Sequence, residues 1–258
     1  MGMGCIISVA NVKGGVGKTT VVHNVSHALT LYDKKVLMID LDLQENLSDR
    51  SIGSRENVKK TAVDVFIDQD IDIKSCIYKT AIQQLDIVPA RIDIAEVSRY
   101  LGEENKSDGL LRLRNQLNKI IGEYDFIFLD LHPSLDFLFA SAMIASDYYI
   151  IPVHPSIDSI KGVNLTTKFA CGLKKVNPKL KELGIVISDF DTRTKVSKQV
   201  TKTLVDLLGD RLFHTKIVHN TTISQAAVNY KTVFQYKSKG ICNENYSDLA
   251  NEIVDRIK

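Results

Sequence analysis

A glycine-rich run near the N-terminus restricts what this chain can fold into more than any other stretch. The run is Lys13-Gly14-Gly15-Val16-Gly17-Lys18-Thr19-Thr20, and it follows the apolar residues 5–9. Apolar residues then recur at helical spacing over 21–29. A strand, a glycine-rich turn and a helix form the setting of a phosphate-binding loop, because glycine backbones and a helix N-terminus offer free N–H groups to an anion. We predict that Lys18 reaches the β- and γ-phosphates of a nucleotide and that the Thr19 hydroxyl binds Mg²⁺.

The loop departs from the common phosphate-binding pattern. The strict pattern Gly-x-x-x-x-Gly-Lys-Ser/Thr would need glycine at position 12, where the chain has Val12, and a second lysine, Lys13, stands early in the loop. This arrangement is the deviant Walker A motif, and it resembles the ParA/Soj/MinD group of P-loop ATPases. In that family the early lysine crosses a dimer interface to the ATP held by the partner subunit. The resemblance therefore implies a role in trans for Lys13.

Acidic residues end two further predicted strands, at the edge where open α/β sheets place ligands. Asp40 and Asp42 follow the apolar run 36–39, and Asp130 ends the run 126–129. Asp130 has the position of a Walker B carboxylate and is expected to hold Mg²⁺ through water, since this ion dehydrates reluctantly. The resemblance assigns the attacking water to Asp42, close to the metal, and leaves Asp40 to orient the metal ligands or the loop. Acids that merely cap the next element are the alternative.

The resemblance implies ATP and Mg²⁺ as cofactors and gives a complete set of site residues. His132 stands where the family often has proline, and it either approaches the γ-phosphate or belongs to a turn without a catalytic part. Asn220 matches a family position and is expected to read the adenine edge. The expected catalytic residues are Lys13, Lys18 and Asp42; the nucleotide-binding residues are Lys13, Gly14, Gly15, Val16, Gly17, Lys18, Thr19, Thr20 and Asn220; and the metal residues are Thr19, Asp130 and Asp42.

Charge is unevenly distributed along the chain. The net charge is +2, but residues 1–160 hold 16 Lys+Arg against 22 Asp+Glu (−6), and residues 161–258 hold 17 against 9 (+8). A basic C-terminal part indicates either a surface that faces a polyanion or an ordinary solvated lysine-rich surface.

One predicted helix in the basic part could carry a DNA-binding face. Its cationic side would carry Lys195, Lys198 and Lys202, and its inward side Val196, Val200, Leu204 and Leu207. Arg193, just before this helix, matches a position that binds DNA non-specifically in chromosomal family members. Thr222 stands where an arginine is usual, which weakens the DNA assignment. The DNA-binding candidates are therefore Arg193, Lys195, Lys198 and Lys202.

Length and composition indicate the fold class and the compartment. The 258 residues, 44% of them hydrophobic, predict one α/β domain over residues 1–258. We expect a doubly wound, mainly parallel sheet of about seven or eight strands. Four scattered cysteines indicate reduced thiols, no apolar run approaches the ~20 residues of a membrane span, and the first strand leaves no room for a secretory signal. We therefore expect a cytoplasmic protein, associated with the nucleoid if it binds DNA.

The resemblance implies a slow, Mg²⁺-dependent ATPase that sandwiches two ATP molecules in a homodimer. The dimer would bind DNA non-specifically, a ParB-like partner would trigger hydrolysis, and the cellular task would be partition of a plasmid or chromosome. A MinD-like membrane-surface or cargo-positioning switch is the main alternative. No membrane binding is expected, because residues 251–258 are as acidic as basic and lack an aromatic residue. An iron–sulfur reductase is disfavoured because Cys171 and Cys242 lie far from Asp130, and a non-enzymatic regulator stays open.

Overall fold

The computed structural model of the chain describes residues 4–94, 96, 97, 99 and 106–258. Within these residues, eight strands form one sheet in the order β3-β4-β2-β5-β1-β6-β7-β8. All neighbouring pairs are parallel except β3 and β4. The strands are β1 (Cys5–Val9), β2 (Val36–Leu41), β3 (Tyr78–Lys79), β4 (Leu85–Val88), β5 (Phe126–Leu131), β6 (Tyr148–Val153), β7 (Lys181–Phe190) and β8 (Leu212–Val218). The predicted sheet class and strand number are confirmed.

Helices cover both faces of the sheet, which explains the nearly continuous apolar runs of the central strands. Successive side chains of a strand point to opposite faces, so Ile6 of β1 packs in one core and Ile7 in the other. The helices are α1 (Lys18–Thr30), α2 (Asn46–Ser51), α3 (Ala62–Ile67), α5 (Lys106–Leu117), α6 (Phe137–Ala145), α7 (Ser159–Leu173), α8 (Lys195–Leu208), α9 (Thr221–Val228), α10 (Val233–Tyr236) and α11 (Ile241–Ile257). Helices α1 and α11 contribute to one core, and α5, α6 and α7 contribute to the other.

The strand order places the carboxyl ends of β1, β2 and β5 side by side. β1 pairs with β5 on one side and with β6 on the other. The chain passes from β1 to β2 on the β5 side, and it later crosses from β5 to β6 on the opposite side of β1. Val9 of β1 and Asp40 of β2 both lie opposite Asp130 of β5 in the strand register. Open α/β sheets bind ligands at such a switch point. The glycine-rich loop and the strand-end acids therefore meet at one edge of the sheet.

The inward face of α8 differs from the predicted one. Ser197, Thr201, Leu204 and Leu208 are buried, whereas Val196 is 72% exposed and Leu207 is 62% exposed. The buried residues are spaced by four, three and four positions, which makes a complete helical stripe. Ser197 and Thr201 are polar, so nothing in the sequence indicated that they are buried. The predicted buried face of α8 is therefore rotated about the helix axis relative to the observed one. The prediction that Val196 and Leu207 pack inward was wrong.

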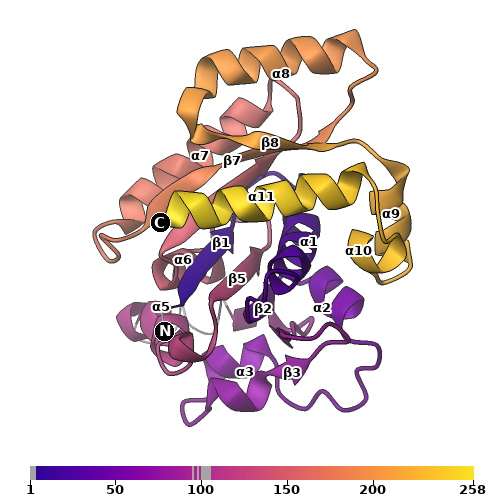
Figure 1. The fold of residues 1–258 in the computed structure, drawn as a ribbon. Coiled ribbons are helices and arrows are strands. Elements are labelled where there is room, and N and C mark those ends of the chain that lie inside the picture. Colours follow the sequence, from indigo (N-terminus) through magenta and orange to yellow (C-terminus); the bar gives the residue numbers. More distant parts are fainter. Residues whose placement is uncertain (1–3, 95, 98, 100–105) are drawn as a thin grey trace.

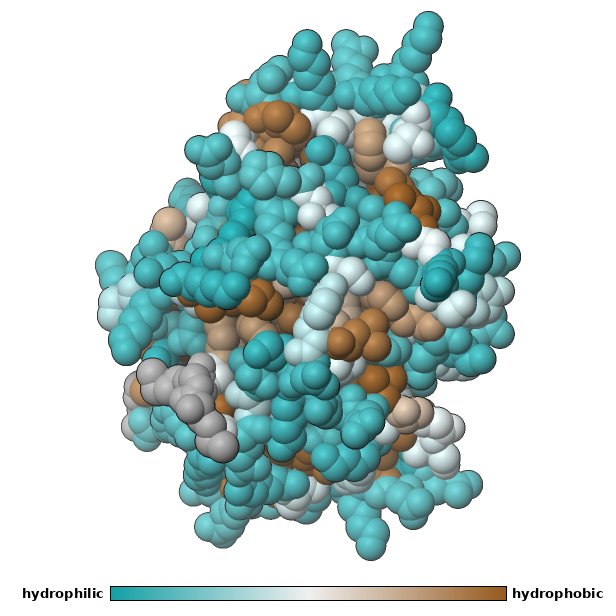
Figure 2. Space-filling model, viewed as in Figure 1, coloured by the Kyte–Doolittle hydropathy of each residue, from teal (hydrophilic) through white to brown (hydrophobic). Residues whose placement is uncertain are grey.

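The surface and the C-terminal helix bear on membrane association. Helix α11 begins at Ile241 and lies across α1 (Figure 1). Its apolar residues Leu249, Ala250 and Ile253 are fully buried in the core. Figure 2 shows a largely hydrophilic face, on which hydrophobic residues gather in separate areas between polar ones. No helix in the described part of the chain has both the length and the apolar content needed to cross a bilayer.

Candidate functional site

The glycine-rich loop joins β1 to α1 with the backbone conformation that its sequence predicts. Gly15 (φ 72°) and Gly17 (φ 88°) both have left-handed conformations, which side chains other than glycine adopt at a cost. α1 begins at Lys18, directly after Gly17. The free N–H groups of the first helical turn and the positive end of the helix dipole therefore face the concave side of the loop.

Two buried polar side chains, which the sequence analysis did not single out, hold the loop from outside. The Asn11 amide donates to the Pro152 carbonyl (2.8 Å) and accepts from the Lys13 N–H (2.9 Å). The Ser188 hydroxyl donates to the Val16 carbonyl (2.8 Å). Because these contacts join β1, β6 and β7, no local sequence pattern signals them. They fix the loop backbone before any ligand binds.

A cavity of about 460 Å³ lies against this loop and collects most of the predicted site residues. Its lining comprises Gly14, Gly15, Gly17, Lys18, Thr19, Thr20, Asp42, Leu43, Gln44, Asn46, Arg50 and Pro133. Lys18 is only 6% exposed, and its Nζ donates to the Lys13 carbonyl (3.4 Å). Val16 is 1% exposed, so only its backbone is available to a ligand. Lys13 is absent from the described lining residues, and its Nζ contacts the Ser156 hydroxyl (3.4 Å).

Three carboxylates converge below the cavity. Asp40 is fully buried and accepts hydrogen bonds from the Ser48 N–H (2.8 Å), the Ser48 hydroxyl (2.6 Å) and the Asp42 N–H (3.0 Å). Asp40 thus orients the loop that carries Asp42, in agreement with one of its two expected roles. Asp42 is 8% exposed and accepts from the Gln44 N–H (2.9 Å). Asp42 forms part of the wall of the cavity.

Asp130 has the features expected of a carboxylate that binds a cation. It is fully buried, and neither carboxylate oxygen forms a hydrogen bond of ordinary geometry with another described residue. Burial, followed by the charge of Asp40, raises the pKa of Asp130 well above its usual range. Thr19 and Lys18 favour the ionised form, but less strongly. Burial likewise raises the pKa of Asp40 to about 6 and lowers the pKa of Lys18.

A divalent cation fits this group of charges. Asp40, Asp42 and Asp130 face the buried ammonium of Lys18. Among the described residues, the oxygens of Asp130 have no hydrogen-bond partner of ordinary geometry, although buried carboxylates normally have one. Among the described residues, no three His, Cys, Asp or Glu side chains are placed to hold a metal by themselves. Mg²⁺ is commonly bound by one or two carboxylates together with water and substrate phosphates. The donor set of Thr19 and Asp130, with Asp42 nearby, suits that mode.

Comparisons with known proteins agree with this geometry. A family model described as an AAA domain matches residues 4–182. The sporulation initiation inhibitor protein Soj of Bacillus subtilis is 31% identical over 253 residues, which cover 98% of this chain and 99% of Soj. The chain belongs to the ParA/MinD family of P-loop ATPases.

Two further relatives are a chromosome partitioning protein and a septum site-determining protein. The chromosome partitioning protein ParA of Caulobacter vibrioides is 30% identical, over 97% of this chain and 94% of that protein. The septum site-determining protein MinD of Pyrococcus horikoshii, solved in complex with Mg-ADP, is 27% identical. Its structure superposes with a TM-score of 0.77 and covers 99% of this chain and 97% of that chain.

A second cavity, of about 260 Å³, extends the ParA/MinD-type loop toward α9. It shares Gly15, Gly17 and Thr20 with the first cavity and also contains Asn220 and Tyr246. Asn220 caps α9, because its side-chain oxygen accepts the Thr222 N–H (2.9 Å). That bond leaves the amide NH₂ of Asn220 for a ligand. Asn220 thus lines a cavity that adjoins the glycine-rich loop, where the sequence analysis expects the adenine.

His132 has a structural bond in this member of the family. Its Nε2 pairs with Asp136 Oδ2 (2.7 Å), and Asp136 caps α6 by accepting the Phe139 N–H (3.0 Å). His132 is only 7% exposed. This contact supports the turn interpretation of His132 rather than an approach to the γ-phosphate.

The DNA-binding candidates lie apart from the cavity, on and next to α8. Arg193 pairs with Asp191 through two bonds (3.0 and 3.1 Å), so its charge is largely neutralised. These bonds lower the pKa of Asp191 to about 2. Lys195, Lys198 and Lys202 are exposed and form no ion pair with a described residue. The three lysines keep the charge that the prediction needs, whereas Arg193 fits it less well.

Proposed function

We propose that the chain is a Mg²⁺-dependent ATPase that converts ATP to ADP and phosphate slowly, within a single domain spanning residues 1–258. The observation that carries this proposal is a single cavity lined by the glycine-rich loop and the buried Lys18, beside the Asp130 carboxylate, whose oxygens have no hydrogen-bond partner of ordinary geometry among the described residues. Phosphoryl transfer needs mainly positioning and neutralisation of charge, and these groups supply both.

Each residue has a separate task in this proposal. The loop N–H groups and Lys18 bind the phosphates, while Thr19 and Asp130 hold Mg²⁺, which neutralises phosphate charge when bound. Asp42 orients the attacking water, because its carboxylate lies in the cavity wall and is held by the Gln44 N–H. Asn220 faces the adenine in the adjoining cavity.

Two subunits enclose the nucleotides, and Lys13 acts across their interface. Lys18 already lines the cavity of its own chain, whereas Lys13 is absent from the described lining residues and its ammonium contacts Ser156. An ammonium supplied by the partner subunit would act like an arginine finger on the transferring phosphoryl group. Hydrolysis would then depend on assembly, and ATP would serve as a timed switch.

The ATP-bound dimer binds DNA without sequence preference and releases it after a ParB-like partner stimulates hydrolysis. The excess of +8 charges in residues 161–258 supports this cytoplasmic, nucleoid-associated role, as do the exposed lysines of α8, which form no ion pair with a described residue. Soj and ParA are named for sporulation control and chromosome partitioning, respectively. A MinD-like membrane or cargo switch is supported less, because the apolar residues of α11 are buried.

Light scattering with nucleotides tests the core of the proposal. Mg-ATP should convert a monomer to a dimer, Mg-ADP should not, and slow phosphate release should accompany the ATP state. A mobility shift on random duplex DNA at low salt should occur only with ATP. A chain that neither binds ATP nor changes mass would refute the ATPase switch. A dimer that leaves the DNA unshifted would refute only the DNA role.

A further inference from the structure

Arg50 is a half-buried cation beside the phosphate loop, and it has no carboxylate partner within ion-pair distance among the described residues. It lies near the end of α2, and its Nη1 donates to Thr20 Oγ1 at 3.5 Å, its sole hydrogen bond to the described part of the chain. Burial lowers the pKa of Arg50, and the attraction of Asp130, Tyr246 and Asp40 does not offset this effect.

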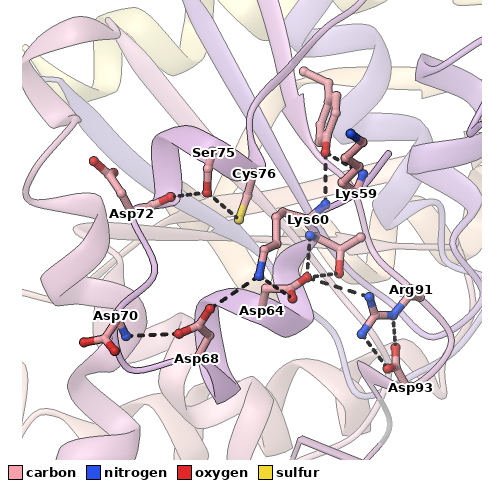
Figure 3. Close-up of polar contacts among 12 residues, drawn as sticks. Lys59, Lys60, Asp64, Asp68, Asp70, Asp72, Ser75, Cys76, Arg91 and Asp93 are labelled. Atoms are coloured by element: carbon pink, nitrogen blue, oxygen red, sulfur yellow. Dashed lines mark hydrogen bonds and ion pairs between the residues drawn. The ribbon is translucent and has the colours of Figure 1, made fainter. Parts of the chain in front are cut away.

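Arg91 is a structural arginine with which the surroundings of Arg50 can be compared. Figure 3 shows its guanidinium between two carboxylates, and it donates to Asp93 through Nε and Nη2, both at 2.7 Å. Its Nη1 lies 3.8 Å from Asp64. Arg91 is thus paired with carboxylates of the protein itself, whereas Arg50 has no such partner in the part of the chain that the structure describes.

The backbone that carries Arg50 is firmly held. Leu47 of α2 is fully buried in the core. The Ser48 hydroxyl donates to Asp40 (2.6 Å) and accepts from the Ala90 N–H (2.8 Å). The guanidinium is therefore presented to the cavity from a fixed position.

The cavity of about 460 Å³ at the glycine-rich loop is the phosphate cavity. Arg50 lines both this cavity and a smaller one of about 120 Å³. The smaller cavity offers it no available anion among its described lining residues. His23 lies there, and burial, with a contribution from the charge of Arg50, lowers the pKa of His23 to about 3, so this ring is neutral. Asp49 also lines this cavity, but its carboxylate pairs with Arg55 (3.1 Å). The open side that can receive an anion is the phosphate cavity.

The position of Thr20 indicates which phosphate Arg50 meets. Thr20 lines both the phosphate cavity and the cavity that contains Asn220, so it lies where the phosphate chain would join the nucleoside. An arginine fork suits phosphate oxygens, and an anion there would offset the cost of the unpaired charge. We propose that Arg50 binds the α-phosphate of the nucleotide, as a second cation of the same chain. This proposal rests on nucleotide binding at the loop.

Calorimetric titration of Mg-ATP and Mg-ADP into Arg50→Gln tests the proposal. Both nucleotides should bind about tenfold more weakly than to the wild type, by the same factor, because both carry the α-phosphate. Arg50→Lys should recover part of the affinity, since it keeps the charge but not the fork. Arg91→Gln, which removes an arginine outside the cavity, should bind both nucleotides as the wild type does.

Thermal unfolding without nucleotide separates binding from a structural role. Removing an unpaired half-buried charge should leave the unfolding temperature of Arg50→Gln unchanged or raised. A lowered unfolding temperature, unchanged affinities, or a loss confined to ATP would each overturn the α-phosphate assignment. If the wild type itself failed to bind ATP, the proposed ATPase function would fall instead.

Discussion

The phosphate cavity and the cationic surface of α8 both concentrate charge, but the charges are buried at the cavity and exposed on α8. In the cavity Asp40 and Asp130 are fully buried, and Asp40 is fixed by bonds to backbone and side-chain groups. On α8 Lys195 and Lys202 are exposed and form no ion pair with a described residue. Buried charges strongly favour a compensating ion in a defined place, whereas exposed charges are screened and tolerate many partners.

Because of this difference, the two regions should respond differently to mutation and to salt. A single substitution in the cavity removes a group that no neighbour replaces. A single lysine on α8 contributes one of several equivalent contacts, so its loss alone should matter little. Effects on hydrolysis should therefore be large and specific, and effects on DNA binding graded and salt-dependent.

The largest effect is expected for Asp42→Ala. Hydrolysis should fall by about 100-fold or more while ATP binding persists, because a carboxylate that orients water contributes to the chemical step. Single-turnover phosphate release and nucleotide titration measure the two properties separately. Asp70→Ala, at an exposed acid well outside the cavity lining, serves as the control. Loss of ATP binding in Asp42→Ala would place this residue with the metal or structural groups.

Lys13→Gln should affect assembly rather than folding. Among the described residues the Lys13 side chain forms one long hydrogen bond, to Ser156, so the monomer should stay folded and bind nucleotide through Lys18. ATP-dependent dimerisation should weaken, and hydrolysis should drop by about 10-fold or more because the trans cation is missing. Light scattering and phosphate release give the two readouts. Normal dimerisation with normal turnover would exclude the role in trans.

The α8 surface should respond to charge reversal in a graded way. Lys195→Glu with Lys202→Glu should abolish the DNA mobility shift, while hydrolysis without partners should persist. For the wild type, each phosphate contact should contribute about −0.9 to the slope of log affinity against log salt on duplex DNA. Lys174→Glu with Lys175→Glu makes the same charge change beyond α7 and should retain more binding. Equal losses in the two double variants would mean that net charge, not α8, governs binding.

The smallest effect on activity is expected at His27, another buried titratable group. Its Nδ1 bonds to the Thr232 hydroxyl (2.6 Å), and burial lowers the pKa of His27 to about 4. The unfolded chain, with a His pKa near ~6.5, binds more protons than the folded chain below that pH, so the wild type loses stability on acidification.

Denaturant titrations of the wild type and His27→Asn at pH 7 and pH 5 measure this effect. The stability advantage of the wild type should shrink by roughly 2 kcal/mol between the two pH values. Hydrolysis at neutral pH should change little, because His27 lies outside the phosphate cavity. A stability difference that does not vary with pH would show that His27 is not held neutral by burial.

The sequence predicted the elements that depend on local pattern. The apolar run before Lys13 and the helical spacing after Lys18 locate β1 and α1, because both signals are local. Asp40 and Asp130 were predicted to lie at strand ends. Their direct alignment, however, depends on the pairing of β2 with β5, whose residues are distant along the chain.

Residues that depend on which segments meet could not be found from spacing. Asn11 and Ser188 hold the loop through strands β6 and β7, and neither belongs to a pattern that signals this contact. In the sequence Arg50 looks like an ordinary surface arginine. Only the structure shows that its side chain contacts Thr20 of the glycine-rich loop. On α8, Ser197 and Thr201 are buried although their residue types favour exposure.

Mixing two impaired variants, Lys13→Gln and Asp42→Ala, tests whether catalysis is shared between two subunits. In a heterodimer of Lys13→Gln with Asp42→Ala, one site would combine the intact Asp42 of the first chain with the intact Lys13 of the second. The other site would lack both groups. If chains pair at random, half of the dimers are mixed and half of their sites are complete, so an equimolar mixture should recover about a quarter of wild-type turnover. A mixture that stays as inactive as its components would show that Lys13 does not act across the interface.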